Sequence, residues 1–150
     1  DYGRSRGLGD VYKRQDLCLF ISIQITAAIL GTIFANYIFG LSIVEISSNI
    51  RSGTNIYISE IFASFGLLMV ILLSKVGGKN IVAFNVGIYI TAAIIFTSSA
   101  SFANPAVSIA RIFTESFAGI NPSTVIFFIG SQVIGMFGAY FLYNRLFKTK

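Results

Sequence analysis

The side chains best suited to contact a small solute belong to Asn104 and its neighbours, in the run SFANPAVSIARIF. Asn104 suits the N-cap of a helix, and Pro105 suits the first helical position, where no backbone N–H is needed. The unpaired N–H groups of such a helix start form a positive end that repels cations and protons, while the Asn104 amide can donate to a passing solute. The alternative is an ordinary N-cap that starts a surface helix, and the tripeptide Asn104, Pro105 and Ala106 alone favours that alternative.

Other kinds of site chemistry are excluded by residues that the sequence lacks. It contains no His and one Cys, Cys18. A His-based catalytic triad and a His-containing zinc site are therefore impossible, and a single Cys cannot form an intrachain disulfide. No nucleophile with a matching base is evident either. We expect no metal, no cofactor and no enzymatic activity.

The composition is that of a membrane protein. Of 150 residues, 55% are hydrophobic and 11% are charged, whereas about a quarter of the residues of a soluble domain are charged. The net charge of +5 comes from 11 basic and 6 acidic residues. In a soluble protein this excess could indicate nucleic-acid binding, but here the basic residues cluster beside apolar runs. We expect a lipid bilayer as partner and no nucleic acid.

The first fifteen residues, DYGRSRGLGDVYKRQ, are polar and basic. They lack the apolar core and the cleavage site of a signal peptide. The part GDVYKRQ resembles a translated sequencing adapter, so we predict that residues 1–15 are not native and leave them out of the fold. The competing interpretation is a basic anchor at the membrane surface. The chain begins with Asp, and we expect the natural start of the gene product to be absent.

Apolar segments in the remaining chain, residues 16–150, predict an all-α membrane protein. A stretch of about twenty apolar residues suffices to cross the hydrocarbon core as a helix. We predict four spans, at 17–41, 56–74, 81–99 and 125–143. A soluble protein with buried helices is the alternative, but four such runs leave almost no polar face for water.

The positions of Lys and Arg predict the orientation, because these residues favour the cytoplasmic side. Basic residues lie between the second and third spans and after the fourth, at Lys75, Lys79, Arg145, Lys148 and Lys150. Both ends are therefore expected inside. In the connection after the first span Arg51 is offset by Glu45, which places that connection outside.

The connection between the third and fourth spans is too apolar for a simple loop and too short to cross and return as two full helices. We predict that it re-enters the membrane with a half-helix at 104–116, which Gly119 and Pro122 terminate. About twelve helical residues rise about 18 Å, roughly half a bilayer. Non-helical backbone at that depth is tolerated where it lines a water-filled path or is buried in protein.

A short internal repeat supports this arrangement. Gln24 is followed by Ala27 and Gly31, and Gln132 is followed by Gly135 and Ala139, with identical spacing. Small residues at this spacing let membrane helices approach closely, which explains part of the match. An inverted repeat, in which each half ends with this helix, explains it better.

Together these segments resemble the major intrinsic proteins, the aquaporins and aquaglyceroporins. The similarity runs from about Leu17 to Phe147, with SFANPAVSIARIF as the second Asn-Pro-Ala half-helix and ISEIFASFGLLMVILL as the fourth helix. It implies a partial aquaporin-like fold without the first two helices and the first half-helix, and a homotetramer for the full-length protein. The loop is most similar to that of a bacterial group found beside arsenic-resistance genes. This implies a multi-pass protein of the bacterial inner membrane with a cytoplasmic C-terminus.

The resemblance also assigns roles to two charged residues. It implies that Glu60 lies buried and accepts hydrogen bonds from the backbone of the re-entrant loop. Without the family resemblance, the simpler interpretation of Glu60 is a solvated carboxylate at the outer interface. Arg111 has two interpretations as well: it lines the wide inner half of the path, or it pairs with Glu115 at i+4 on the half-helix.

At the positions that set selectivity, the sequence departs from water-specific members. Val107 stands where the family usually places an arginine, Ala92 where strict water channels have histidine, and Ser101 at the loop position. These residues imply a wide, weakly polar constriction. We therefore expect a passive channel for small neutral solutes, with arsenite, glycerol-like polyols and water in that order. The alternative is a secondary transporter with a broken helix.

Overall fold

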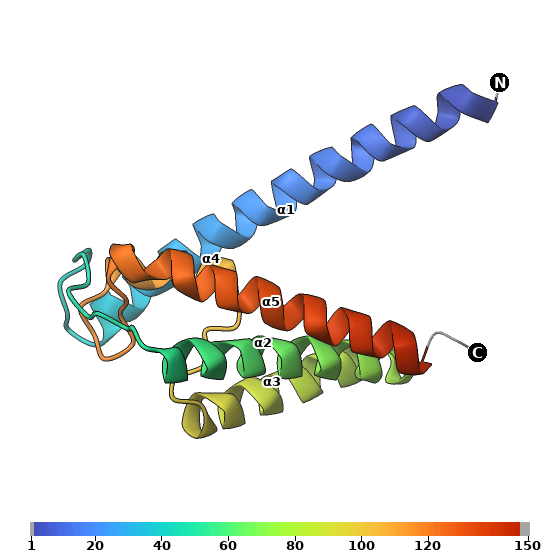
Figure 1. Ribbon diagram of the computed structural model, residues 1–150. Coiled ribbons are helices and arrows are strands. Elements are labelled where there is room, and N and C mark those ends of the chain that lie inside the picture. The colour runs from blue at the N-terminus through green and yellow to red at the C-terminus, as the bar shows by residue number, and fades with distance from the viewer. Residues whose placement is uncertain (1, 148–150) are drawn as a thin grey trace.

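The computed structural model describes the backbone of residues 2–147 and the side chains of residues 15–147, and this part of the chain is all-helical (Figure 1). Lys148 and Lys150, two of the residues behind the predicted orientation, lie outside it. The elements are α1 (Tyr2–Ile38), α2 (Thr54–Ser74), the 3₁₀ turn η1 (Lys75–Gly77), α3 (Lys79–Phe96), α4 (Pro105–Ala110), the 3₁₀ turn η2 (Arg111–Phe113) and α5 (Pro122–Phe147). Four of these helices are long and apolar enough to cross a membrane.

The predicted spans match these four helices, with different ends. The first helix stops at Ile38 instead of residue 41, because Gly40 takes φ 68° and the Leu41 N–H bonds to the Asn36 carbonyl oxygen at 2.9 Å. The helix α3 stops at Phe96 instead of residue 99, where the chain becomes extended at Thr97. The prediction of 56–74 was two residues short at its start.

The last helix is longer than the predicted 125–143. Pro122, which we expected to end the half-helix, is instead the first residue of α5. The Asn121 side chain accepts a hydrogen bond from the Ser123 N–H at 3.0 Å, which makes Asn121 the N-cap. Proline at the first helical position needs no N–H partner, and Pro122 is therefore well suited to start α5. Its role is to begin the last helix and not to end the half-helix.

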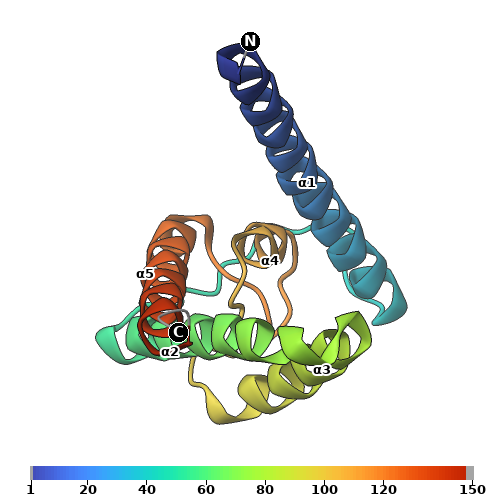
Figure 2. The same ribbon diagram turned by 90° about the vertical axis from the view of Figure 1, so that its right-hand side faces the viewer.

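The helices α2, α3 and α5 lie side by side, and α1 leaves them at an angle (Figures 1 and 2). The short α4 lies between α1 and α5 and contacts both. Connection 39–53 gathers at one end of the molecule with the start of connection 97–121 and with the part of it that follows the half-helix, and we call this end the loop end. The start of α1, the α2–α3 connection and the end of α5 lie at the other end. The half-helix thus lies between two long helices.

The most extensive contact between helices is that of α2 with α5, and small residues allow a close approach there. Gly135 and Ala139 of α5 are buried. A Cβ added at Gly135 would overlap the Ile61 carbonyl oxygen and lie 3.0 Å from the Phe65 nitrogen. The matching Gly31 of α1 has open space around it. The repeated small residues therefore serve close packing in α5, and in the described part of the chain they do not do so in α1.

This contact leads to the first prediction, that Gly135→Ala destabilises the protein. The added methyl group meets backbone of α2 that cannot rotate away, and overpacking of this kind costs about 1–3 kcal/mol. Gly130→Ala is the matched control on the same helix, because nothing lies within 4 Å of its added Cβ. The control should be neutral or stabilising by about 0.5–1 kcal/mol, since Ala is the better helix former. Thermal unfolding in detergent measures both, and equal effects would contradict close packing at Gly135.

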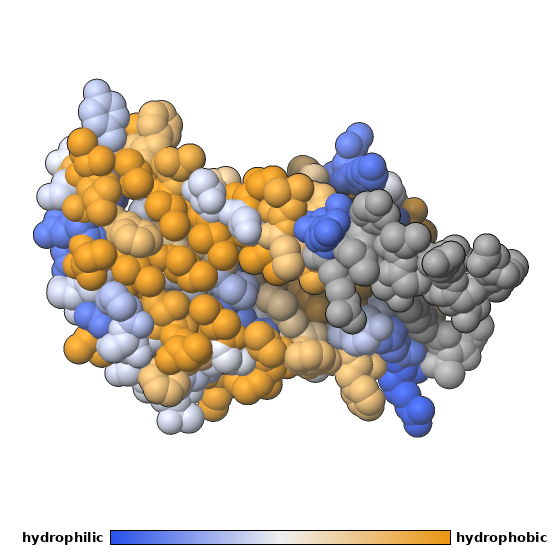
Figure 3. Space-filling view, turned by 90° about the horizontal axis from the view of Figure 1, so that it is seen from above, coloured by the Kyte–Doolittle hydropathy of each residue, from blue (hydrophilic) through white to orange (hydrophobic). Residues whose placement is uncertain are grey.

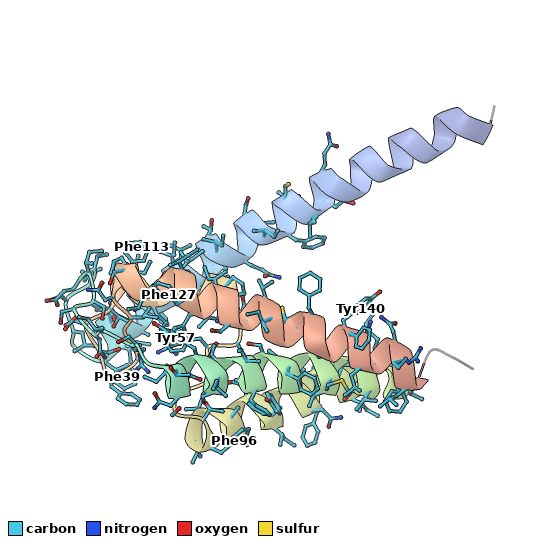
Figure 4. The ribbon with its side chains drawn as sticks, viewed as in Figure 1. Phe39, Tyr57, Phe96, Phe113, Phe127 and Tyr140 are labelled. Carbon is cyan, nitrogen blue, oxygen red and sulfur yellow. The ribbon has the colours of Figure 1, made fainter. Side chains whose placement is uncertain are left out.

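The third span is attached to the second by polar contacts. The Tyr89 hydroxyl donates to the Ala63 carbonyl oxygen at 2.9 Å, and the Asn85 amide donates to the Ser74 hydroxyl at 2.8 Å. At the loop end the rings of Tyr57 and Phe127 join α2 to α5, with centroids 5.7 Å apart (Figure 4). These contacts fix the frame in which the half-helix sits.

Large apolar side chains cover the outside of the helices. In the space-filling view they spread over a broad face, with hydrophilic residues mainly toward the two ends (Figure 3). Phe96, Phe127 and Tyr140 are each more than half exposed (Figure 4). A soluble monomer rarely exposes so extensive an apolar surface. The surface suits the hydrocarbon core of a bilayer.

Candidate functional site

The half-helix starts at Asn104, as the sequence predicts. The Asn104 Oδ1 accepts a hydrogen bond from the Ala106 N–H at 2.9 Å, and Pro105 is the first helical residue. The amide nitrogen of Asn104 has no acceptor within residues 15–147. Asn104 therefore uses its oxygen to cap the helix and keeps its two N–H groups for another partner.

The half-helix ends earlier than predicted. The α-helix stops at Ala110, η2 adds one turn to Phe113, and Thr114 is extended, so the predicted end at 116 was three residues too far. The last carbonyl groups have partners from other segments. The Asn36 amide of α1 donates to the Phe113 oxygen at 2.9 Å, and the Ser47 N–H donates to the Ile112 oxygen at 2.8 Å. Because these distant groups satisfy the helix end, Gly119 is not needed to terminate it.

The start of the half-helix lies at mid-depth. Asn104, Pro105 and Ala106 border a cleft of about 400 Å³ together with residues from the middle of three long helices, among them Gln24, Leu68 and Met136. The far end of the half-helix, at Phe113, contacts Asn36 near the end of α1. The half-helix thus runs from the middle of the spans to the loop end. This is the geometry of a re-entrant segment.

The backbone that enters the membrane before Asn104 is strained. Ala100, Ser101 and Ala103 have φ of 59°, 44° and 48°, a region that L-residues seldom adopt and that costs about 1–3 kcal/mol each. This backbone conformation directs the Ala103 N–H toward α2, where the Glu60 Oε1 accepts its hydrogen bond at 2.5 Å. A buried acceptor therefore holds the loop in this shape.

Glu60 is at the centre of a buried network. It has no exposed surface, which is incompatible with a solvated carboxylate at the interface. Its Oε1 also accepts from the Gln132 Nε2 at 2.8 Å, and the same nitrogen donates to the Ser108 hydroxyl at 2.8 Å. The Ser108 hydroxyl in turn donates to the Asn104 carbonyl oxygen at 3.3 Å. Two long helices, α2 and α5, thereby hold the start of the half-helix.

Sequence reasoning missed two members of this network. Gln132 was noticed for its place in the repeat, and Ser108 was not noticed at all. A polar residue in the middle of an apolar span is itself a signal for a buried partner, and it could have linked Gln132 with Glu60.

The three predicted selectivity residues lie in different surroundings. Ala92 is exposed on α3, beside a shallow cleft with Thr91 and Gly87. Ser101 is buried, and its hydroxyl has no hydrogen-bond partner within residues 15–147. Val107 borders a separate cleft between α1 and the half-helix. The described residues do not bring the three side chains to one surface, and their joint role stays a prediction.

Arg111 does not pair with Glu115 along the half-helix, and its guanidinium instead donates to the Ala118 carbonyl oxygen of the re-entrant segment at 3.4 Å. Glu115, the carboxylate considered as its ion-pair partner, follows the extended Thr114 and so is not one helical turn away from Arg111. Glu115 accepts hydrogen bonds from the Ser48 N–H at 2.6 Å and from the Ser48 hydroxyl, and these bonds lower the pKa of Glu115. Arg111 itself lies at the loop end of the half-helix, on the side predicted to face outward. Whether Arg111 lines a solute path stays a prediction, because the orientation is itself predicted.

Arg51 has a larger structural role than its charge suggested. Its guanidinium donates to the Gly119 oxygen at 2.8 Å, the Phe117 oxygen at 2.6 Å and the Ser99 oxygen at 3.5 Å. Burial lowers the pKa of Arg51, and the charge of Glu60 partly offsets this effect. One side chain from the first connection therefore joins both halves of the re-entrant segment.

These features define a class of protein. It is a multi-pass α-helical membrane protein with a half-helix that returns to mid-depth, and a buried glutamate holds the loop before that half-helix by hydrogen bonds. The chain is 40% identical over 122 residues to the aquaglyceroporin AqpS of Rhizobium meliloti (strain 1021), a match that covers 81% of this chain and 52% of the relative. The chain belongs to the major intrinsic protein family. It spans about half the length of this curated relative. No family model and no solved structure matches it.

Proposed function

We propose that this chain forms part of a passive transmembrane channel for small neutral solutes. The observation that carries the proposal is the half-helix start at mid-depth, with Asn104 N–H groups that have no protein acceptor within the described residues. A positive helix end beside a hydrogen-bond donor favours neutral molecules with oxygen atoms and disfavours cations. Such a site needs no nucleophile or base, and the proposed protein is a channel and not an enzyme.

The proposed solutes are neutral arsenite, glycerol-like polyols and water, in that order. The name of the Rhizobium relative, an aquaglyceroporin, supports a path wide enough for more than water. The residue types at Ala92, Ser101 and Val107 support the same width, because two of them are small and none carries a charge. A constriction without a bulky donor has little means to exclude a polyol.

We further propose the orientation and assembly that the resemblance implies. Lys75, Lys79 and Arg145 all lie at the end opposite the loop end, as expected if that end faces the cytoplasm (Figure 1). The proposed location is the bacterial inner membrane, and the proposed full-length assembly is a homotetramer. Residues 1–15 have no part in the channel, although the backbone of α1 extends back to Tyr2.

The runner-up function, a secondary transporter, needs a group that couples solute movement to an ion. Within residues 15–147, Glu60 is the one buried carboxylate among the spans, and its Oε1 is engaged by Ala103 and Gln132. Its other oxygen is buried without a partner. A carboxylate sealed from solvent in this way is poorly placed to exchange protons with both sides of a membrane.

The test uses a chimera in which residues 16–147 replace the matching segment of the Rhizobium aquaglyceroporin. We predict that liposomes with this chimera equilibrate glycerol to the outside concentration, at the same rate with and without a proton or sodium gradient. Protein-free liposomes give the background. Accumulation above the outside concentration, driven by either gradient, would overturn the channel in favour of the transporter.

A further inference from the structure

A cleft of about 750 Å³ lies between α1 and the loop-end half of the half-helix. Its walls are mostly apolar or small, from residues such as Ala28, Gly31, Val107 and Ala110. Among the described residues that line it, Arg111 is the one charged side chain. A cation in an apolar cleft is costly unless a counter-charge or hydrogen-bond acceptors surround it.

The Arg111 guanidinium has few acceptors in the protein. Within residues 15–147 it donates to the Ala118 carbonyl oxygen at a long 3.4 Å, and it lies 5.5 Å from the centroid of the Phe102 ring. Glu115 is engaged by Ser48, and Glu60 is engaged by Ala103 and Gln132. A guanidinium has five N–H donors. Most of those of Arg111 therefore have no described partner.

A second cation strengthens the positive field at this place. The Arg51 guanidinium lies 5.2 Å from the centroid of the same Phe102 ring. Its donors are used by three backbone carbonyl groups, so it adds charge without offering a further binding group. The two guanidinium groups repel each other, and an anion between α1 and the half-helix would relieve that repulsion.

Hydroxyl groups complete the polar part of the cleft. Thr114 and Ser116 line it, and the oxygen of each accepts a hydrogen bond from a backbone N–H, at 3.3 Å in both cases. An oxygen that already accepts leaves its O–H hydrogen available to donate. The cleft thus presents a planar cationic fork with two hydroxyl donors.

We propose that this cleft binds a small monovalent carboxylate or oxyanion through Arg111. The planar fork of a guanidinium matches two anion oxygens in a bidentate pair, which is both stronger and more directional than a single hydrogen bond. The Phe102 ring against Arg111 holds the plane of the fork. Because Val107 borders the same cleft, an anion bound there would stand beside the path proposed for neutral solutes. The site itself does not depend on that path.

The test titrates sodium formate against the purified chain in detergent, with sodium chloride at equal ionic strength as the reference, and follows binding by calorimetry. Arg111→Gln should weaken formate binding by about ten- to a hundredfold, the loss expected when a hydrogen bond to a charged group is removed. Arg111→Lys keeps the charge without the fork and should give an intermediate loss. Lys75→Gln, which removes one positive charge at the opposite end, is the matched control and should bind formate normally.

Helix content and the unfolding midpoint in chloride check that each variant folds. If Arg111→Gln does not fold, the comparison of Arg111→Lys with Lys75→Gln decides. Formate binding that is absent in the unaltered chain, unchanged by substitution of Arg111, or weakened equally by Lys75→Gln would overturn the proposal. None of these readouts depends on conduction, so they are independent of the channel test.

Discussion

Glu60→Ala is expected to release the re-entrant loop and to cause the largest loss of stability of any single substitution considered for this protein. The Ala103 N–H and one Gln132 N–H both donate to the Glu60 carboxylate inside the protein, where water cannot replace the acceptor. Each buried donor left without an acceptor costs about 1–3 kcal/mol. The strained backbone at Ala100, Ser101 and Ala103 loses its support at the same time. We expect lower thermal stability and faster hydrogen exchange of the Ala103 amide.

Two further variants separate the hydrogen bonds from other effects. Glu60→Gln retains a carbonyl oxygen and should lose less, about 1 kcal/mol per bond, because bonds to a charged acceptor are stronger than neutral ones. Glu45→Ala removes an exposed carboxylate from the first connection and should change little. If Glu60→Ala keeps the wild-type stability and the slow exchange of Ala103, the carboxylate does not hold the loop.

Hydropathy and helix signals were sufficient to predict the helical frame. Long apolar runs with at most one charge predicted the four spans, and Asn104 with Pro105 predicted the start of the half-helix. Helix ends were less predictable because partners distant in sequence determine them. The half-helix stops at Phe113 because Asn36 and Ser47 supply donors to its last carbonyl groups. A local signal at Gly119 could not reveal this.

The site was predictable in part. The contact of Glu60 with the loop backbone came from the family resemblance, because an isolated glutamate near the start of a span has a simpler explanation. The sequence indicated only the charge of Arg51 and not its structural role. Its acceptors are backbone carbonyl oxygens between Ser99 and Gly119, and such partners leave no trace in residue types. Polar side chains that bind side chains are easier to find in a sequence than those that bind backbone.

The second large effect concerns selectivity at Val107, in the chimera with the Rhizobium aquaglyceroporin. Val107 is half-buried on the first turns of the half-helix and borders the cleft beside α1. Val107→Arg places a long cationic fork where an apolar side chain stood, which fills space and adds donors. We expect glycerol and arsenite permeation to fall by about tenfold relative to water, equivalent to about 1.4 kcal/mol in the barrier. Water is smaller and accepts the new hydrogen bonds.

Val107→Ile is the control that adds volume without donors, and it should change the glycerol-to-water ratio less than the arginine. Both fluxes are measured in the same proteoliposomes by light scattering after an osmotic step, so that differences in the amount of inserted protein cancel in the ratio. Val107 also packs against the buried cluster that contains Phe102, Ile120 and Phe128, and equal unfolding midpoints are needed for the comparison. A glycerol-to-water ratio that Val107→Arg leaves unchanged would mean that Val107 lies outside the constriction, and the proposed preference for larger neutral solutes would lose its basis.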